Sequence, residues 1–153
     1  MKYVVVDIDG TIAKSHTRQA KILKLIKTIP HEEMPWKELF ADLMDDEPIE
    51  PIVGLIRCLC REYRIVFCTS RNVEYRDETR EWITEHAGFW SAPLLMRPSA
   101  DDHRSDTIVK PELLEEAGIT PENTAFIIED KISTVACWRE LGFTVLQPAN
   151  NEY

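Results

Sequence analysis

Two aspartates follow a short apolar run near the start of the chain. Asp7 and Asp9 stand in the segment VVVDIDGT, which continues into Gly10 and Thr11. Residues two apart on a strand share a face, so we expect both carboxylates on one side of the strand end, with Gly10 allowing a sharp turn. Such a pair repels unless a cation joins it, and Mg²⁺ suits oxygen ligands of this kind. The alternative is a pair of turn-forming aspartates.

Two later segments carry groups that could handle a phosphate. Thr69, Ser70 and Arg71 end an apolar run, where a hydroxyl could bond a phosphoryl oxygen and Arg71 could grip it with two hydrogen bonds. Lys110, in DTIVKPELL, is expected in the first turns of a helix. There it could neutralise charge on a phosphoryl group in transfer. Taken alone, these are ordinary loop and surface residues.

A second acidic pair, Glu129 and Asp130, follows the run AFII. Asp130 could also cap the helix that is expected next, and the two roles can coexist. Groups at the carboxyl ends of separate parallel strands meet in one crevice. Together these segments supply a nucleophile, an acid/base, phosphate donors and metal ligands, as phosphoryl transfer requires.

The elements that must position these residues alternate along the chain. Apolar runs predict five strands, at Tyr3–Ile8, Arg64–Cys68, Pro93–Met96, Ala125–Ile128 and Phe143–Leu146. Helical spacing predicts helices at Glu50–Tyr63, Val73–Ala87, Thr107–Ala117 and Lys131–Leu141. This alternation predicts an α/β fold: a Rossmann-like parallel sheet of about five strands, with helices on both faces.

The segment Ser15–Asp46 does not follow the alternation. It contains helical patterns at Gln19–Ile29 and Trp36–Met44. An insert after the first strand would lie at the carboxyl edge of the sheet, where ligands bind in such folds. We therefore interpret residues 1–153 as one domain with a small helical cap at about residues 15–46. The alternative is a plain surface hairpin.

Composition limits the function classes. The chain of 153 residues fits one domain and has a net charge of −9, which argues against broad nonspecific binding to nucleic acid without excluding a small basic pocket. No apolar run approaches the ~20 residues of a membrane helix, and the N-terminus does not resemble a signal peptide. These features predict a cytoplasmic protein with no membrane association. The four cysteines are expected to be reduced.

In order along the chain, DIDGT, the strand ending in Thr69, Lys110 and IIED resemble the four motifs of the haloacid dehalogenase (HAD) superfamily. The resemblance implies a HAD fold and a phosphatase that works through an aspartyl-phosphate. Asp7 would be the nucleophile and Asp9 the general acid/base. Mg²⁺ would be held by Asp7, the backbone carbonyl of Asp9, and the Glu129/Asp130 pair.

A narrower resemblance covers EYRDETREWITEHAG, LLMRPSADDHRSDTIVK and FIIEDKISTVACWRELGFTVLQ, which look like the 3′-phosphatase domain of phage polynucleotide kinase-phosphatase. It implies a phosphorylated nucleotide or nucleic-acid 3′ end as the substrate, with no obligate protein partner evident. Functional residues of that family map onto Arg18, Arg71 and Asp106. On the substrate side we also place four further residues, Gly10, Thr11, Ser70 and Arg76.

Some features depart from that family, and two other functions compete. The chain has no GxxxxGK[ST] P-loop, reads TSR in the second motif, has Glu129 where an aspartate is usual, and carries a longer insert. The acidic charge and the insert favour a 5′-nucleotidase or a small-metabolite phosphatase. A phosphoacceptor signalling domain would be the non-enzyme alternative, but Asp9, two residues from Asp7, supplies the acid/base that turnover needs.

Overall fold

Five parallel strands form the central sheet, in the order β5-β4-β1-β6-β7. The strands are β1 (Tyr3–Val6), β4 (Arg64–Asn72), β5 (Leu94–Arg97), β6 (Thr124–Ile128) and β7 (Val145–Leu146). The structure is a computed structural model that describes residues 1–25, 27–30, 33–35 and 42–152. The predicted parallel α/β architecture is confirmed.

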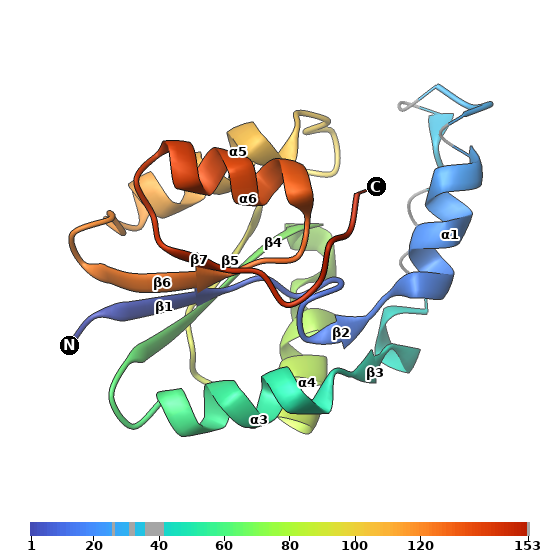
Figure 1. Cartoon of the computed structure of the whole chain (residues 1–153). Helices are drawn as coiled ribbons and strands as arrows, with labels where there is room; N and C mark the ends of the chain where they lie inside the picture. The colour runs from blue at the N-terminus through green and yellow to red at the C-terminus, as the bar shows by residue number, and fades with distance from the viewer. Residues whose placement is uncertain (26, 31–32, 36–41, 153) are drawn as a thin grey trace.

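Two helices cover each face of the sheet (Figure 1). On one face lie α3 (Glu50–Leu59) and α4 (Arg76–Ala87), and on the other α5 (Asp106–Glu116) and α6 (Ile132–Glu140). Side chains alternate between the faces of a strand, so Val4 and Val6 enter the core under α3 and α4, while Val5 enters the core under α5 and α6. Burial on both faces explains why the strands read as continuous apolar runs.

The first strand ends earlier than predicted. β1 stops at Val6 rather than Ile8, because the Ile8 carbonyl accepts hydrogen bonds from the backbone N–H groups of Thr11, Ile12 and Ala13. These bonds fold the chain into a tight loop directly after the strand. Gly10 lies in this loop with a φ of 84°, in the left-handed region that favours glycine. Asp7 and Asp9 therefore belong to a loop and not to a strand face.

Other boundaries also shift by a few residues. β4 continues to Asn72, and a 3₁₀ turn, η3 (Val73–Tyr75), precedes α4. α5 begins at Asp106, because the Ser105 side chain accepts from the Thr107 N–H and caps the helix. Gly88 ends α4 in the left-handed conformation, as the sequence predicts.

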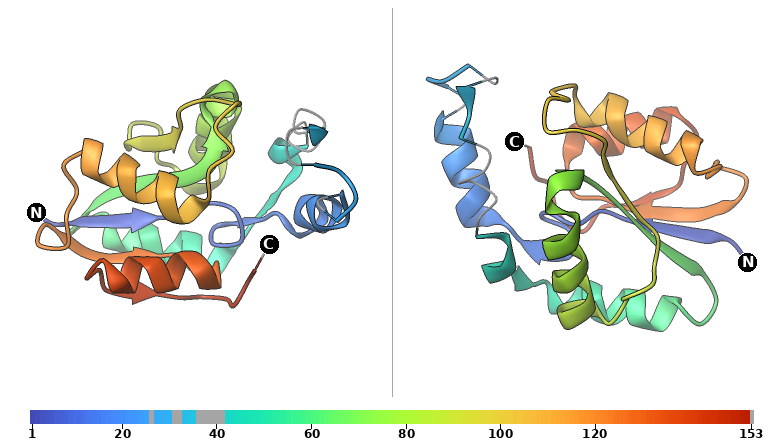
Figure 2. Two further views of the ribbon diagram at one scale, coloured as in Figure 1. Left: turned by 90° about the horizontal axis from the view of Figure 1, so that it is seen from above. Right: turned by 180° about the vertical axis from the view of Figure 1, so that it is seen from behind.

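The described part of the insert consists of α1 (His16–Leu25), a 3₁₀ turn η2 (Leu43–Asp45), and a short antiparallel ribbon of β2 (Ala13–Lys14) with β3 (Glu47–Pro48). The predicted Gln19–Ile29 helix thus starts and ends earlier. Most of the predicted Trp36–Met44 helix lies outside the described residues. α1 stands beyond the carboxyl end of β1 in each view (Figures 1 and 2).

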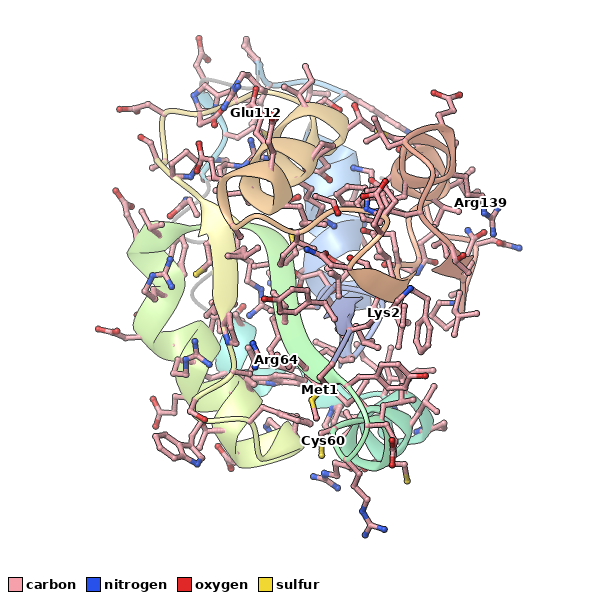
Figure 3. All side chains as sticks on the ribbon, turned by 90° about the vertical axis from the view of Figure 1, so that its left-hand side faces the viewer. Met1, Lys2, Cys60, Arg64, Glu112 and Arg139 are labelled. Carbon is pink, nitrogen blue, oxygen red and sulfur yellow. The ribbon has the colours of Figure 1, made fainter. Side chains whose placement is uncertain are left out.

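The opposite, amino edge of the sheet is seen in Figure 3. A cavity of about 360 Å³ lies there, lined among others by Cys60, Arg64 and the exposed Trp90. It is separated by the length of the strands from the candidate site residues of the sequence analysis.

All four cysteines are free thiols. Within the described ranges, no helix is long and apolar enough to cross a membrane.

Candidate active site

The ends of β1 and β6 and the start of α5 bring together the first group of candidate residues. The Asp7 N–H donates to the Ile128 carbonyl at 3.0 Å, which fixes the backbone of Asp7 beside the end of β6. Lys110, on α5, donates from Nζ to Asp7 Oδ1 and to Glu129 Oε2, each at 2.7 Å. Three segments distant in the sequence thus converge at the carboxyl edge of the sheet, as predicted.

Thr11 connects the first motif to the fourth. Its hydroxyl is 3.0 Å from Asp7 Oδ2 and 2.8 Å from Asp130 Oδ1. Asn151, near the C-terminus, donates from Nδ2 to Asp130 Oδ2 at 2.7 Å. Gly10 packs so closely that a Cβ atom there would lie 2.2 Å from Asp130 Oδ2. Gly10 and Thr11 therefore contact the acidic group directly.

The site is short of positive charge. Carboxylate oxygens of Asp7, Glu129 and Asp130 lie within 4.8 Å of one another, and all three residues are buried. Burial raises the pKa of Asp7 well above its usual value, and Glu129 and Asp130 raise it further, while Lys110 offsets only part of this shift. Three carboxylates face one lysine. These hard oxygen donors and the excess negative charge fit a divalent cation.

A second cluster surrounds Asp9. Arg71 donates to the Asp9 carboxylate from Nε at 2.9 Å and from Nη2 at 2.7 Å, and Arg18 Nη2 lies 2.6 Å from Oδ1. Burial alone would raise the pKa of Asp9, but the two guanidinium groups outweigh it and hold this pKa well below its usual range. The two arginines are themselves almost fully buried. Asp9 is therefore an ionised carboxylate that two arginines hold in place.

Asp46 also belongs to this cluster and was not predicted. It forms ion pairs with Arg18 and, at 3.5 Å, with Arg71, and its carbonyl accepts from Trp82 Nε1 at 2.8 Å. Its side chain is 9% exposed. Asp46 lies in the acidic run DDEP, where nothing in the sequence distinguishes it from its exposed neighbours Asp45 and Glu47. The two ends of the insert thus meet at Asp9.

A third set of contacts lies beside the group formed by Asp7, Lys110, Glu129 and Asp130. Arg97, at the end of β5, donates to the Ser70 carbonyl and to Asp106 Oδ1, each at 3.0 Å. Asp106 also accepts from Lys131 Nζ at 2.9 Å. Burial would raise the pKa of Asp106, but Lys110 and Lys131 outweigh it and lower this pKa to about 2. Asp106 thus pairs with cations and connects the second, third and fourth motifs.

Thr69 and Arg76 have structural partners. The Thr69 hydroxyl accepts from the Arg71 N–H at 3.2 Å and is buried. Arg76 donates from Nη1 to the Leu94 carbonyl at 3.0 Å, so its guanidinium connects α4 to β5. A substrate contact by Arg76 stays a prediction.

Comparison with known proteins agrees with this geometry. The family model of the polynucleotide kinase PNKP phosphatase domain matches residues 1–153. The chain belongs to this family. It is a phosphatase domain of the HAD type, and the predicted superfamily and enzyme class are confirmed. A PNKP phosphatase domain is also what the narrower resemblance implied.

Relatives of this PNKP phosphatase domain are longer than the chain itself. A protein of Autographa californica nuclear polyhedrosis virus, described as a bifunctional polynucleotide kinase/RNA ligase, is 26% identical over 144 residues, which are 90% of this chain and 18% of the viral protein. The chain thus spans less than a fifth of that relative.

Solved structures share the fold. A chain of the Pnkp1/Rnl/Hen1 complex matches with a TM-score of 0.75 and 22% identity, over 99% of this chain and 47% of that one. A haloacid dehalogenase-like hydrolase from Streptococcus pneumoniae matches with a TM-score of 0.62 and 16% identity, over 96% and 84% of the two chains. At these identities the likeness concerns the fold.

Proposed function

We propose that this chain is a magnesium-dependent phosphomonoesterase that removes the 3′-phosphate from a nucleotide or polynucleotide end through an aspartyl-phosphate on Asp7. The observation that carries the proposal is the convergence of Asp7, Lys110, Glu129 and Asp130 at one strand edge. Asp7, the Asp9 carbonyl and the Glu129/Asp130 pair would hold Mg²⁺, which would neutralise phosphate charge.

Asp7 is suited to attack phosphorus. Lys110 donates to Oδ1, which gives the carboxylate a fixed direction, and the Thr11 hydroxyl lies 3.0 Å from Oδ2. In the first step an Asp7 oxygen bonds to phosphorus, and the bond to the leaving oxygen breaks. Lys110 would stabilise charge on the transferring group, because its buried ammonium lies 2.7 Å from the attacking carboxylate. Thr69, at the end of the neighbouring strand β4, supplies a hydroxyl for a phosphoryl oxygen.

Asp9 would give a proton to the leaving oxygen and later take one from the attacking water. Its present contacts with Arg18 and Arg71 favour the ionised form. A substrate phosphate competes for the same guanidinium groups. If even one arginine turns from Asp9 to the phosphate, Asp9 loses part of the positive charge that favours its ionised form. Its carboxyl can then hold a proton. Substrate binding and acid catalysis are therefore coupled through the two arginines.

Membership of the PNKP phosphatase family supports a 3′-end substrate. Arg18 and Arg71 also support it, because they stand where the resemblance places functional residues of the 3′-phosphatase family. The viral relative is named for a polynucleotide kinase and an RNA ligase, and a structural neighbour is part of a complex. We accordingly propose nucleic-acid ends as substrate and a ligating enzyme as the one that uses the product. The 5′-nucleotidase alternative is favoured by the net charge of −9 and by Asp46, which neutralises arginines that a polynucleotide backbone would need.

One comparison decides between them. We expect kcat/KM for a 3′-phosphorylated oligonucleotide to exceed that for a 5′-nucleotide and a sugar phosphate at fixed salt, with no activity in excess EDTA. A free 3′-nucleotide shows how much the neighbouring backbone contributes. Better turnover of the 5′-nucleotide or the sugar phosphate would refute the 3′-end proposal, and full activity in EDTA would refute the metal requirement.

A further inference from the structure

The chain after β7 returns to the acidic group. The Asn151 N–H donates to the Asp130 carbonyl at 3.2 Å, and the Ile132 N–H donates to the Asn151 carbonyl at 2.8 Å. Glu152 accepts from the Ser133 N–H and hydroxyl at 3.0 and 2.8 Å. The described C-terminal segment, up to Glu152, accordingly lies at the same end of the sheet as α1 (Figures 1 and 2). Backbone bonds and Glu152 hold this segment in place independently of the Asn151 side chain.

The Asn151 side chain completes the environment of Asp130. Its amide donates to Oδ2 at 2.7 Å, while the Thr11 hydroxyl donates to Oδ1 at 2.8 Å. Two donors on different oxygens fix the carboxylate plane. Each carboxylate oxygen has two acceptor positions, so a hydrogen bond to an oxygen does not by itself prevent that oxygen from binding a cation. Asp130 is fully buried, so its orientation depends on donors from the protein more than that of a surface carboxylate does.

We propose that Asn151 is a positioning residue for the divalent cation, acting through Asp130. The inference rests on the proposed metal dependence. Donors behind a metal ligand orient it, and their loss typically lowers metal affinity by about 10–100-fold. Without Asn151, Asp130 turns about its bond to Thr11 and presents its oxygens to the cation in several orientations. The site then forms only at higher cation concentration.

Asn151→Ala tests the proposal, with Asn150→Ala as the matched control because Asn150 is the adjacent, exposed asparagine. Direct Mn²⁺ binding, measured from the electron paramagnetic resonance signal of free Mn²⁺, avoids relying on turnover. We expect the Kd of Asn151→Ala to rise about 10–100-fold and that of Asn150→Ala to stay unchanged. The Mg²⁺ concentration for half-maximal activity should rise in parallel, while kcat recovers at saturating Mg²⁺.

Melting in EDTA separates positioning from folding. We expect all three proteins to melt within a few degrees of one another, since the variant keeps the backbone bonds. Unchanged Mn²⁺ affinity in Asn151→Ala would overturn the inference and leave the proposed phosphatase standing. A kcat that stays low at saturating Mg²⁺ would also overturn it. A wild-type protein that binds no Mn²⁺ would refute both this inference and the proposed metal site.

Discussion

Gly10→Ala should damage the site far more than the fold. Gly10 has a φ of 84°, and its new Cβ would lie 2.2 Å from Asp130 Oδ2 and 2.8 Å from Asp130 Cγ. Ordinary contacts to a Cβ start at 3.4 Å. Asp130 cannot keep its position beside the new Cβ, and it cannot move without straining its hydrogen bonds to Thr11 and Asn151. The substitution therefore forces a displacement of a proposed metal ligand.

The loss of stability and the loss of activity caused by Gly10→Ala differ in size. A left-handed alanine costs about 1–2 kcal/mol, which for a domain of this size lowers Tm by roughly 2–8 °C. Relief of the clash requires Asp130 to move by about 1 Å, and a misplacement on this scale lowers the rate of a catalysed reaction about 100-fold. We expect kcat/KM to fall about 100-fold, together with Mg²⁺ affinity.

Two glycines supply matched controls. Gly88→Ala carries the same strain, with a φ of 83°, but its Cβ meets nothing within 4 Å, so we expect a similar loss of Tm with normal activity. Gly54→Ala lies in α3, has open space, and should stabilise the protein by about 0.5–1 kcal/mol. Phosphatase assays with a Mg²⁺ titration and melting curves measure all three. Equal activities of Gly10→Ala and Gly88→Ala would refute the reasoning.

Three further predictions concern the surroundings of the site. Asp46→Asn should lower the free energy of unfolding by about 1–2 kcal/mol in denaturant titrations, less than the loss of an isolated buried pair because Asp9 still compensates the arginines; unchanged stability would show that the pairs contribute nothing. Arg97→Lys should lose at least two hydrogen bonds and about 2 kcal/mol of stability, with a lower kcat, whereas Arg104→Lys, on the loop that follows β5, should behave as wild type; equal effects of the two substitutions would contradict the prediction for Arg97. Asp130→Ala should weaken Mg²⁺ binding more than Glu129→Ala, and a reversed order in calorimetric titrations would contradict this ranking.

The order of strands and helices could be predicted from the sequence because burial on both faces leaves apolar runs and helical spacing. Boundaries were less predictable where loops compete with regular structure. Ile8 is apolar and β-branched and reads as strand, yet its carbonyl binds three N–H groups of the following loop. The ribbon of β2 and β3 has two residues per strand, too few for any periodicity.

For the site, the motif residues Asp7, Lys110 and Asp130 could be predicted to converge because the carboxyl ends of parallel strands, and the first turns of the helices that follow them, share one edge of the sheet. Partners contributed by irregular segments could not. Asp46 and Asn151 reach the site because the chain folds back there, and no sequence motif or hydrophobic period marks them. Both also lie next to residues of similar type. Their contacts depend on how the insert and the C-terminal segment fold back, which local sequence does not determine.

The central claim is that Asp7 accepts the phosphoryl group. Rapid acid quenching of the enzyme during turnover, followed by peptide mass spectrometry, measures this directly. The account predicts one phosphoryl group on the peptide that contains Asp7, formed at least as fast as turnover, and neither label nor activity in a folded Asp7→Asn variant. Turnover without a phosphopeptide, a label on another residue, or near-normal activity of Asp7→Asn would contradict it.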